Sequence, residues 1–475
     1  MAIDDIIPRD QDFTNVHGDH GDRPFDPLVN VDDLVMIQEF GVTVPSSLSL
    51  FLRENGDAVA GIEALPPGAF EVSHRLNLLI PELTAGLDPN AADLPTPDGV
   101  APNRNFSRQG LHQLFIPVFP VRTGGAATTV EMWPFASRNP DIVTFPSPPI
   151  RCVEGEVCHT RLSNRSGPHT IHHHGIEPTS MNDGVGKLSM EVSGPDYVYQ
   201  WQANEAGTYF YHCHRNTALH FEMGMYGMLL VDPPAPVGSG LTAPYTTGGA
   251  GFIRRRSELV RYDREAVWVP DDIDPRWREL ANVSRQYGIT DPAPLGDPTG
   301  FFYHSDWNGV LNGEFNPQTP LVNDGDPTLP PGLHFFDPQY FVISGVSSPW
   351  TVPQAPGMPL RPPGIPADGV SVRAAPGQTV LVRLLNASYT TMRFTFPLDA
   401  EVVGIDGHSL GHGARAQYSQ PFVVPAGESF VLTTARRWDL LLHNVPVGTH
   451  TANMEFRSWT NDTHYHTAQA QIIVA

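Results

Sequence analysis

The sequence predicts an all-β protein built from two β-sandwiches in tandem, preceded by an irregular N-terminal extension. Three observations support this prediction. The 475 residues include 43 glycines and 48 prolines, an excess that is typical of turn-rich β structure. Short runs of β-type residues recur along most of the chain, separated by Gly, Asn, Pro and Asp. The two halves also resemble each other weakly, with VCHTRLSN and AGTYFYHCH in the first and VLVRLLN and VGTHTANME in the second.

Composition changes along the chain divide it into four segments. Residues 1–104 mix acidic, proline-rich and short apolar pieces without a sustained period, which predicts an extension that covers other parts of the protein. The first sandwich is expected at residues 105–235, with the runs LFIPVFPV, TTVEMW, VCHTRL, YVYQWQ, TYFYHCH and MLLVDPP. Residues 236–260 are rich in Pro and Gly and are the expected linker. The second sandwich is expected at residues 261–475, with AVWVPDD, YFVISG, TVLVRLLN, FVLTTA and AQIIVA.

Charge and hydropathy exclude two classes of partner. The formal net charge is −22, and so acidic a chain repels phosphate backbones, so we expect no nucleic-acid partner. No run of about 18 consecutive apolar residues is present, so we expect no membrane span. The first residues, MAIDDIIPRDQDF, show no signal peptide.

The three cysteines fall in two contexts. Cys152 and Cys158 flank VEGEV, an expected tight turn between two strands, so they either face each other as a disulfide or remain two half-buried thiols. The sequence leaves both alternatives open. Cys213 stands among histidines instead, in YHCHRNTALHFEMGMYG.

Strand geometry divides the metal-binding residues into two sets. Side chains alternate along a strand, so His212 and His214 share one face while Cys213 points to the other. In the upstream segment PHTIHHHG, two histidines share a face and His169 has the opposite parity. The loop after Cys213 is expected to add a histidine and a methionine on the cysteine side. The cysteine set is therefore His169, Cys213, His220 and Met225, and the histidine set is His172, His174, His212 and His214.

The chemistry of the two sets points to copper. Two imidazoles, one thiolate and a distant thioether are the ligands of a blue-copper site, whereas four imidazoles without carboxylates suit copper or zinc. Zinc uses the same residue types, but it would need neither Met225 nor the second set. Cys213 is covalently adjacent to His212 and His214, which gives an electron a short through-bond route between the two sites. We therefore expect an electron relay, with Cys213 and His220 carrying the electrons.

These motifs resemble those of a known family. HTIHHHG and HCHRNTALHFEMGM are similar to the H-x-x-H-x-H-G and H-C-H…H-x-x-x-x-M patterns of the multicopper oxidases, a superfamily that includes laccases, ferroxidases and copper nitrite reductases. MNDGV, EAGTYFYHCH and GMYGMLLVDPP resemble a first cupredoxin domain of that family, and YFVISGVSSP, VRLLNAS, VVGIDGHSL and VPAGESFVLTT resemble its copper-free second domain. The resemblance implies tandem Greek-key cupredoxin sandwiches. It also implies type 1 copper on the cysteine set, a type 2 ligand at His172, and type 3 ligands at His174, His212 and His214.

The chain departs from the family pattern in the copper motifs. RNTAL, between His214 and His220, is longer than the laccase insertion and shorter than that of the nitrite reductases, which puts the role of His220 in question. The nitrite reductases have an acid in place of His172 and lack the second histidine after the cysteine, so the present residues favour oxygen chemistry.

A larger departure concerns the second half of the copper cluster. In this family a trinuclear cluster takes four histidines from each of two domains, and the internal alignment places Phe394, Phe396, Asn453 and Glu455 at the second set of positions. The missing ligands must therefore come from elsewhere. His464 with His466, and His408 with His412, form short pairs that either face a cluster or lie as ordinary loop residues. Two-domain members of the family close their clusters across trimer interfaces, so a neighbouring subunit is one source.

The favoured function is a laccase- or ferroxidase-like copper oxidase. It would take single electrons from a small reducing substrate, a phenol, an aromatic amine or a metal ion, at the exposed edge of His220, and reduce dioxygen to water at the histidine set. The alternatives are a type 1 copper electron-transfer or copper-binding subunit with an incomplete cluster, and a nitrite-reductase-like enzyme. Copper and a possible disulfide favour a periplasmic or extracellular location, although no export signal is visible.

Overall fold

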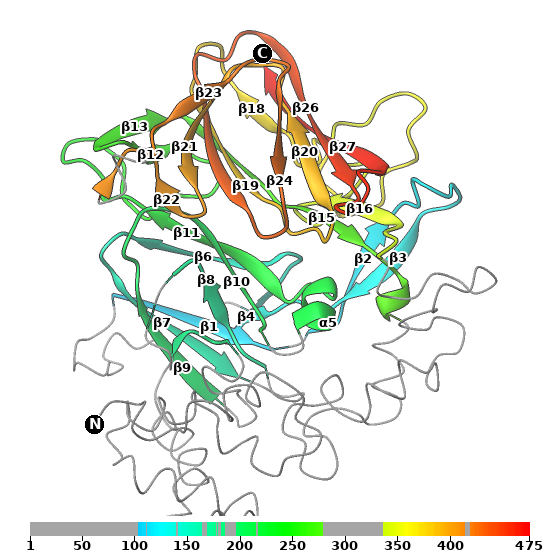
Figure 1. Cartoon of the computed structure of the whole chain (residues 1–475), viewed down its shortest axis with the longest axis horizontal. Helices are drawn as coiled ribbons and strands as arrows, with labels where there is room; N and C mark the ends of the chain where they lie inside the picture. The colour runs from blue at the N-terminus through cyan, green and yellow to red at the C-terminus, as the bar shows by residue number, and fades with distance from the viewer. Residues whose placement is uncertain are drawn as a thin grey trace, which may run out of the picture.

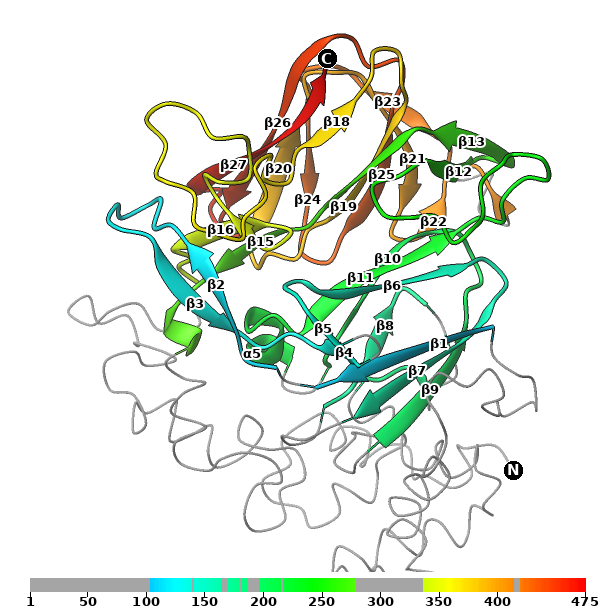
Figure 2. The ribbon, with the colours of Figure 1, turned by 180° about the vertical axis from the view of Figure 1, so that it is seen from behind.

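Strands joined by tight turns form two β-sandwiches, which lie one above the other in Figure 1 and, seen from behind, in Figure 2. This computed structural model describes residues 103–475, except residues 111, 139–140, 164–168, 177, 179–181, 186–195, 215–216, 279–335 and 414–418. The extension predicted at residues 1–104 thus lies almost wholly outside the described residues. The predicted all-β fold is confirmed, and each β-type run identified in the sequence contains a strand.

The first sandwich packs a five-stranded sheet on a four-stranded sheet. The larger sheet has the order β5 (Asp141–Val143), β4 (Ala136–Arg138), β1 (Arg104–Gln109), β7 (Val157–Ser163) and β9 (Asp196–Gln202). The smaller has the order β6 (Ser147–Val153), β11 (Tyr226–Asp232), β10 (Gly207–His212) and β8 (His172–His174). β1 runs parallel to β7 and β6 parallel to β11, while the other neighbours are antiparallel.

Aromatic side chains with a two-residue spacing form the core of the first sandwich. Tyr197, Tyr199 and Trp201 alternate along β9, and Tyr209 and Tyr211 alternate along β10. All five are buried between the two sheets. Each such burial stabilises the fold by about 1.5–3 kcal/mol, so the alternation determines which face of β10 points inward.

The second sandwich is built in the same way. Its six-stranded sheet has the order β14 (Arg264–Trp268), β19 (Val380–Leu385), β25 (Arg437–Leu442), β21 (Ala400–Ile405) and β22 (His408–Ser409), with β23 (Phe422–Val424) paired to β21. Its five-stranded sheet has the order β18 (Val372–Ala374), β27 (His464–Val474), β26 (Gly448–Arg457), β20 (Thr391–Thr395) and β24 (Ser429–Leu432).

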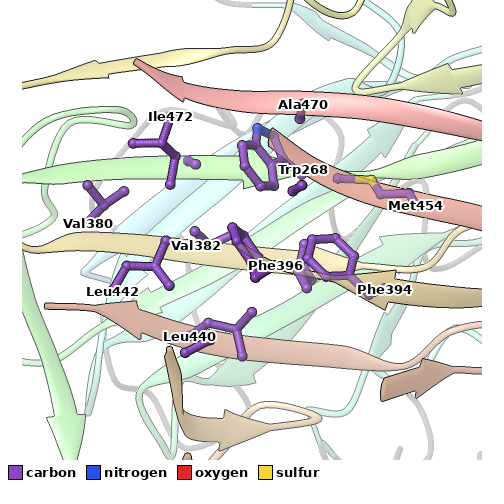
Figure 3. Close-up of a cluster of buried hydrophobic side chains, with 14 of the residues drawn as sticks. Trp268, Val380, Val382, Phe394, Phe396, Leu440, Leu442, Met454, Ala470 and Ile472 are labelled. Atoms are coloured by element: carbon purple, nitrogen blue, oxygen red, sulfur yellow. The ribbon is translucent and has the colours of Figure 1, made fainter. Parts of the chain in front are cut away.

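The core of the second sandwich is aromatic and aliphatic. Figure 3 shows Trp268, Phe394 and Phe396 packed together among aliphatic side chains of the neighbouring strands. The Trp268 ring stacks on Phe396 with centroids 5.9 Å apart. Phe394 and Phe396, which the internal alignment matched to ligand positions of the first sandwich, serve here as core residues.

Smaller elements flank the two sandwiches. They are the hairpins β2 (Leu114–Val118) with β3 (Thr128–Met132) and β12 (Gly251–Arg255) with β13 (Glu258–Tyr262), the sheet of β15 (Pro270–Ile273), β16 (Tyr340–Ile343) and β17 (Val346–Ser347), and helix α5 (Thr217–Glu222). Most of the β12–β13 hairpin falls within residues 236–260, the predicted linker, so this segment contains regular structure. The domain boundaries themselves stay a prediction.

Apolar side chains join the two sandwiches. The outward face of the four-stranded sheet contributes Phe210, Met228 and Leu230 to a cluster that includes Val269 and Leu385 from the second sandwich. These residues are buried. The interface therefore continues the hydrophobic packing of each sandwich, and the two form one structural unit.

A buried charged network lies in the same interface. Arg383 of β19 is fully buried, and its Nε donates to Glu265 at 2.6 Å while its other nitrogens reach Asp232 at 3.3 Å and Asp439 at 3.5 Å. Arg151 of the first sandwich also donates to Asp232 and Glu265. Burial alone would raise the pKa of Glu265, but the two arginines hold it below its ordinary value. Paired charges thus link strands of both sandwiches.

The structure decides between the two alternatives for Cys152 and Cys158. Cys152 and Cys158 are free thiols, and both are fully buried rather than half-buried. A hydrogen bond to Cys158, together with burial, raises the pKa of the Cys152 thiol well above its ordinary value. Among the described residues, no helix has the length and apolar character needed to cross a membrane.

Replacing Arg383 tests the charged network. Arg383→Met removes the cation and leaves the carboxylates of Glu265, Asp232 and Asp439 buried without their main partner, so we expect the free energy of unfolding to fall by about 3–5 kcal/mol. Urea denaturation measures this change. Arg373→Met is the control, because Arg373 forms an exposed ion pair with Asp368, and its unfolding midpoint should stay close to that of the wild type. Equal midpoints for both variants would contradict a role for the network.

Candidate metal centre

Strand β10 has two faces with different neighbours. Tyr209 and Tyr211 point into the first core, together with Cys213, which directly follows the strand. Phe210 points the opposite way, into the interface with the second sandwich, and His212 stacks on it with ring centroids 5.1 Å apart. The predicted alternation along this segment is confirmed, since the thiol and the flanking imidazoles lie on opposite sides of one sheet.

The cysteine set meets on the core side. The Cys213 Sγ lies 3.3 Å from the Nδ1 of His220 and 3.8 Å from the Nδ1 of His169. The two imidazole centroids are 4.9 Å apart, and all three side chains are buried. One thiolate and two imidazole nitrogens this close together can hold a single soft metal ion between them.

Backbone hydrogen bonds hold Met225 next to the cysteine set. Its N–H donates to the carbonyl of His220 at 2.9 Å, and its carbonyl accepts the N–H of Cys213 at 3.0 Å. The side chain is fully buried in the core that contains Cys213. Met225 remains the predicted axial ligand.

His220 lies on helix α5, whereas the sequence predicted a loop. TALHFE contains good helix formers, and one and a half turns suffice to bring His220 back beside Cys213. Its exposed edge is also a wrong prediction: only 8% of His220 is exposed. Neighbouring side chains therefore separate most of this imidazole from solvent.

The second sandwich fixes α5 at both ends. The Tyr389 hydroxyl donates to the carbonyl of Ala218 at 2.7 Å. The buried carboxylate of Glu222 accepts the N–H of Asp274 at 2.9 Å and forms an ion pair with Arg278. Because these contacts lie on either side of His220, the interface between the sandwiches determines where this imidazole sits.

The histidine set meets on the interface side. β8 and β10 pair so that His172 lies opposite His212 and His174 opposite Phe210. The His174 Nδ1 is 3.3 Å from the His212 Nε2, and the His172 ring lies 5.2 Å from the rings of both. His214 joins them, with its ring 5.4 Å from that of His172. His172, His174 and His212 each offer a nitrogen to one common point.

Burial keeps these imidazoles in the neutral form that binds metals. It lowers the pKa of His174 to about 3, and the positive charge of Arg437 adds to the effect. It also lowers the pKa of His212 well below its ordinary value, and that of His214 to a lesser degree. At neutral pH these three rings are therefore available as ligands without loss of a proton.

Hydrogen bonds from the Nδ1 atoms of two rings orient these members of the histidine set. The His172 Nδ1–H donates to the carbonyl of Asp183 at 2.7 Å, and the His212 Nδ1–H donates to the carbonyl of Cys213 at 3.0 Å. Both tautomers leave Nε2 with a lone pair for a metal. The backbone N–H of His214 donates to the Thr170 hydroxyl at 2.8 Å, which ties the two ligand segments together.

His173 lies between two members of the histidine set in the sequence, but its side chain packs in the core of the first sandwich. Its ring is fully buried in the first core beside Tyr199 and Trp201, and its Nε2 lies 3.1 Å from the Thr160 hydroxyl. Burial lowers its pKa well below the ordinary value. His173 anchors β8 from inside while its neighbours face the interface.

Arg437 of the second sandwich lies beside the histidine set. Its guanidinium lies over the Phe210 ring at 5.4 Å, and its Nη2 is so close to Gly175 that an added Cβ there would lie only 2.6 Å away. It donates to the carbonyls of Ala435 and Asp406. Sequence reasoning missed Arg437 because it searched the second half for imidazoles.

The remaining candidate histidines do not join the set within this chain. His464 is exposed and contacts the Thr467 hydroxyl, while His466 contacts the Ser348 hydroxyl at 2.8 Å and the Phe341 ring. His408 pairs with Glu205 of the first sandwich at 2.9 Å. Of the residues that the structure describes, only the two groups above bring three or more such ligands together.

Comparisons with known proteins match the copper motifs. Residues 143–236 match the family model described as multicopper oxidase. The multicopper oxidase MmcO of Mycobacterium tuberculosis is 25% identical over 304 residues, which cover 63% of this chain and 46% of that protein. Copper resistance protein A of Escherichia coli is 37% identical over 156 residues, covering 31% of this chain and 22% of that protein. The resemblance predicted from the motifs is confirmed, and with it copper as the cofactor of the family.

These relatives are longer than the part that is matched. The chain spans less than half the length of MmcO and of copper resistance protein A. Among solved structures, the blue copper oxidase of Nitrosomonas europaea overlays with a TM-score of 0.47 at 19% identity, covering 78% of this chain and 86% of that one.

A pH titration of stability tests the buried carboxylates behind α5. Asp272 is fully buried where it accepts the Tyr389 N–H, and burial raises its pKa to about 7. The native state thus binds the proton more tightly than the unfolded chain, whose aspartates have a pKa near ~4, so stability is lost as pH rises from about 4 to about 7. The advantage of Asp272→Asn over wild type should grow by about 1.4 kcal/mol per pH unit across this interval, measured by urea denaturation. A difference that is constant with pH would refute this assignment.

Proposed function

Because residues 143–236 match the multicopper oxidase family model, we propose that this protein is a copper-dependent oxidase that takes single electrons from a small reducing substrate and delivers them to dioxygen. The observation that carries the proposal is the pair of ligand groups on opposite sides of one sheet. Bound copper would supply one-electron redox chemistry at the cysteine set and the reduction of dioxygen to water at the histidine set.

The cysteine set would hold type 1 copper. His169, Cys213 and His220 would be its close ligands and Met225 its weak axial ligand, which is the donor set of blue-copper sites. The first core excludes water from these residues, and the helix that carries His220 is fixed by the second sandwich. A buried, rigid ligand set of this kind suits electron transfer, since little has to move when the charge on the metal changes.

The histidine set would hold the metals that meet dioxygen. His172 would be the type 2 ligand, and His174, His212 and His214 would be type 3 ligands. The peptide bonds on either side of Cys213 connect it to His212 and His214, so the chain itself supplies the electron route between the sets. Two orienting contacts, from Asp183 and from the Cys213 carbonyl, keep the ligand nitrogens directed away from the main chain.

A complete trinuclear cluster would require ligands beyond the four residues of the histidine set. Among the residues of the second sandwich that the structure describes, Arg437 lies beside the histidine set and no imidazole joins it. We propose a homo-oligomer, such as a trimer, in which His464 and His466 of a neighbouring copy are the leading candidates for the missing ligands. The same observation favours one alternative, a type 1 copper electron-transfer subunit in which the histidine set stays incomplete.

The visible spectrum tests the type 1 site. Copper-loaded wild type should show an intense charge-transfer band from the Cys213 thiolate, and Cys213→Ser should lose it while the fold, followed by circular dichroism, is kept. Cys158→Ser is the matched control, because it removes a buried thiol that belongs to neither ligand group and should retain the band. A wild type without the band, or a Cys213→Ser variant that keeps it, would refute the assignment.

Copper content and oligomeric mass separate the oxidase from the electron carrier. About four coppers per chain in an oligomer would support the oxidase, whereas about one per chain would support the carrier. Replacing both His464 and His466 by alanine should lower the copper content of the oligomer and abolish oxygen consumption while the type 1 band remains. Unchanged copper content in this variant would exclude the two histidines as ligands.

A further inference from the structure

The β2–β3 hairpin places a polar and aromatic surface next to the buried His220. In β-hairpins, residues that pair directly across the strands share one face, and alternate residues point to the other. Phe115 pairs with Glu131, so both lie on the same face, together with Gln113 two residues earlier. Ile116, Val130 and Met132 point the other way into the interface core. We call Gln113, Phe115 and Glu131 the hairpin face.

Trp133 connects the hairpin face to His220. Its indole N–H donates to the Glu131 Oε1 at 2.8 Å, and its ring meets the His220 ring edge-on, with centroids 6.5 Å apart. Only 5% of Trp133 is exposed. A continuous series of contacts therefore leads from the Glu131 carboxylate at the surface, through the Trp133 indole, to the His220 imidazole of the cysteine set.

The hairpin face is accessible and its carboxylate is held in place. Phe115 is 55% exposed, and Gln113 is also exposed. The Gln113 side-chain amide donates to the same Glu131 oxygen as Trp133, again at 2.8 Å. Two hydrogen bonds to one oxygen fix the carboxylate beside an aromatic ring that solvent can reach.

We propose that the hairpin face binds the reducing substrate, that this substrate is an aromatic amine, and that Trp133 conducts its electron to His220. The inference rests on the proposed oxidase function and deepens it by naming the substrate class and its binding residues. The Phe115 ring would pack against the aryl group, and Glu131 would accept the amine N–H. The net charge of −22 also disfavours anionic donors.

The proposed one-electron oxidation of the amine accounts for both its electron and its proton. The amine loses one electron and one N–H proton, which leaves a neutral aminyl radical. The proton goes to the Glu131 carboxylate and from there to water. The electron would pass through Trp133 to His220, and copper held by the cysteine set, as the proposed function has it, would be the one-electron acceptor.

Binding of a redox-inert amine tests the hairpin face without any copper chemistry. The probe is benzylamine, observed by saturation-transfer NMR with the full chain kept reduced by ascorbate. We expect Glu131→Gln and Phe115→Ala each to weaken binding about tenfold, because each removes one of the two contacts. Glu258→Gln replaces an exposed carboxylate of the β12–β13 hairpin and Trp459→Ala an exposed aromatic ring between β26 and β27, and both variants should bind as the wild type does. Equal binding by all five proteins would overturn the proposal.

Anaerobic reduction of the type 1 band tests the electron route. With N,N-dimethyl-p-phenylenediamine, Glu131→Gln and Phe115→Ala should slow reduction about tenfold at low donor concentration, while ferrocyanide should reduce all variants at similar rates. Trp133→Leu should lower the limiting rate at saturating amine without changing the band. If ferrous ion is slowed by Glu131→Gln but the amine is unaffected by Phe115→Ala, the face binds a metal ion and the aromatic-amine assignment is wrong. A wild type without a band would refute the proposed function, whereas the benzylamine result would still decide the hairpin face.

Discussion

The covalent adjacency of Cys213 to two histidines, on a segment whose side chains alternate, is the constraint on which the rest of the site depends. A β-strand directs consecutive side chains to opposite faces, so one sheet separates the thiol from the imidazoles while the main chain joins them. The aromatic residues at 209 and 211 fix the phase of this alternation by burying one face in the first core. A slip of one residue would exchange the two sets and place the thiol in the interface.

The described part of the second sandwich positions the cysteine set, and none of its residues joins the two ligand groups within the chain. Its contacts with Ala218 and Glu222 fix the helix that carries His220, and Arg383 ties the central strands of both sandwiches together through buried carboxylates. Buried charges of this kind add little net stability compared with apolar packing, but they tolerate only one arrangement of the strands. The geometry of the cysteine set therefore depends on both sandwiches, although all four of its residues belong to the first.

Local patterns were sufficient to predict the sandwich fold, the runs that became strands, and the division of ligands into two sets, because each follows from a period of two within one segment. Features that depend on residues far apart in the sequence could not be predicted from these local patterns. The short helix at His220 is held partly by contacts with the second sandwich, the burial of its imidazole comes partly from Trp133 about 90 residues earlier, and Arg437 reaches the histidine set from the other half of the chain. TTVEMW was recognised only as a strand, since nothing in that run shows that Glu131 and Trp133 are hydrogen-bonded beside His220. The pairing of His408 with Glu205 is equally non-local.

The position of Arg437 restricts the directions from which further metal ligands can reach the histidine set. Its guanidinium occupies the space between Phe210 and Gly175, and two backbone carbonyls together with the Asp406 carboxylate hold it there. Moving it aside would break these contacts and leave buried acceptors unpaired, which is costly. A positive charge next to His174 also disfavours an additional cation on that side. On the side where Arg437 lies, the described part of the second sandwich is thus closed to the histidine set both sterically and electrostatically. Ligands that complete the proposed cluster would have to approach from a side that Arg437 leaves open, and the proposed neighbouring copy is one source that could reach it.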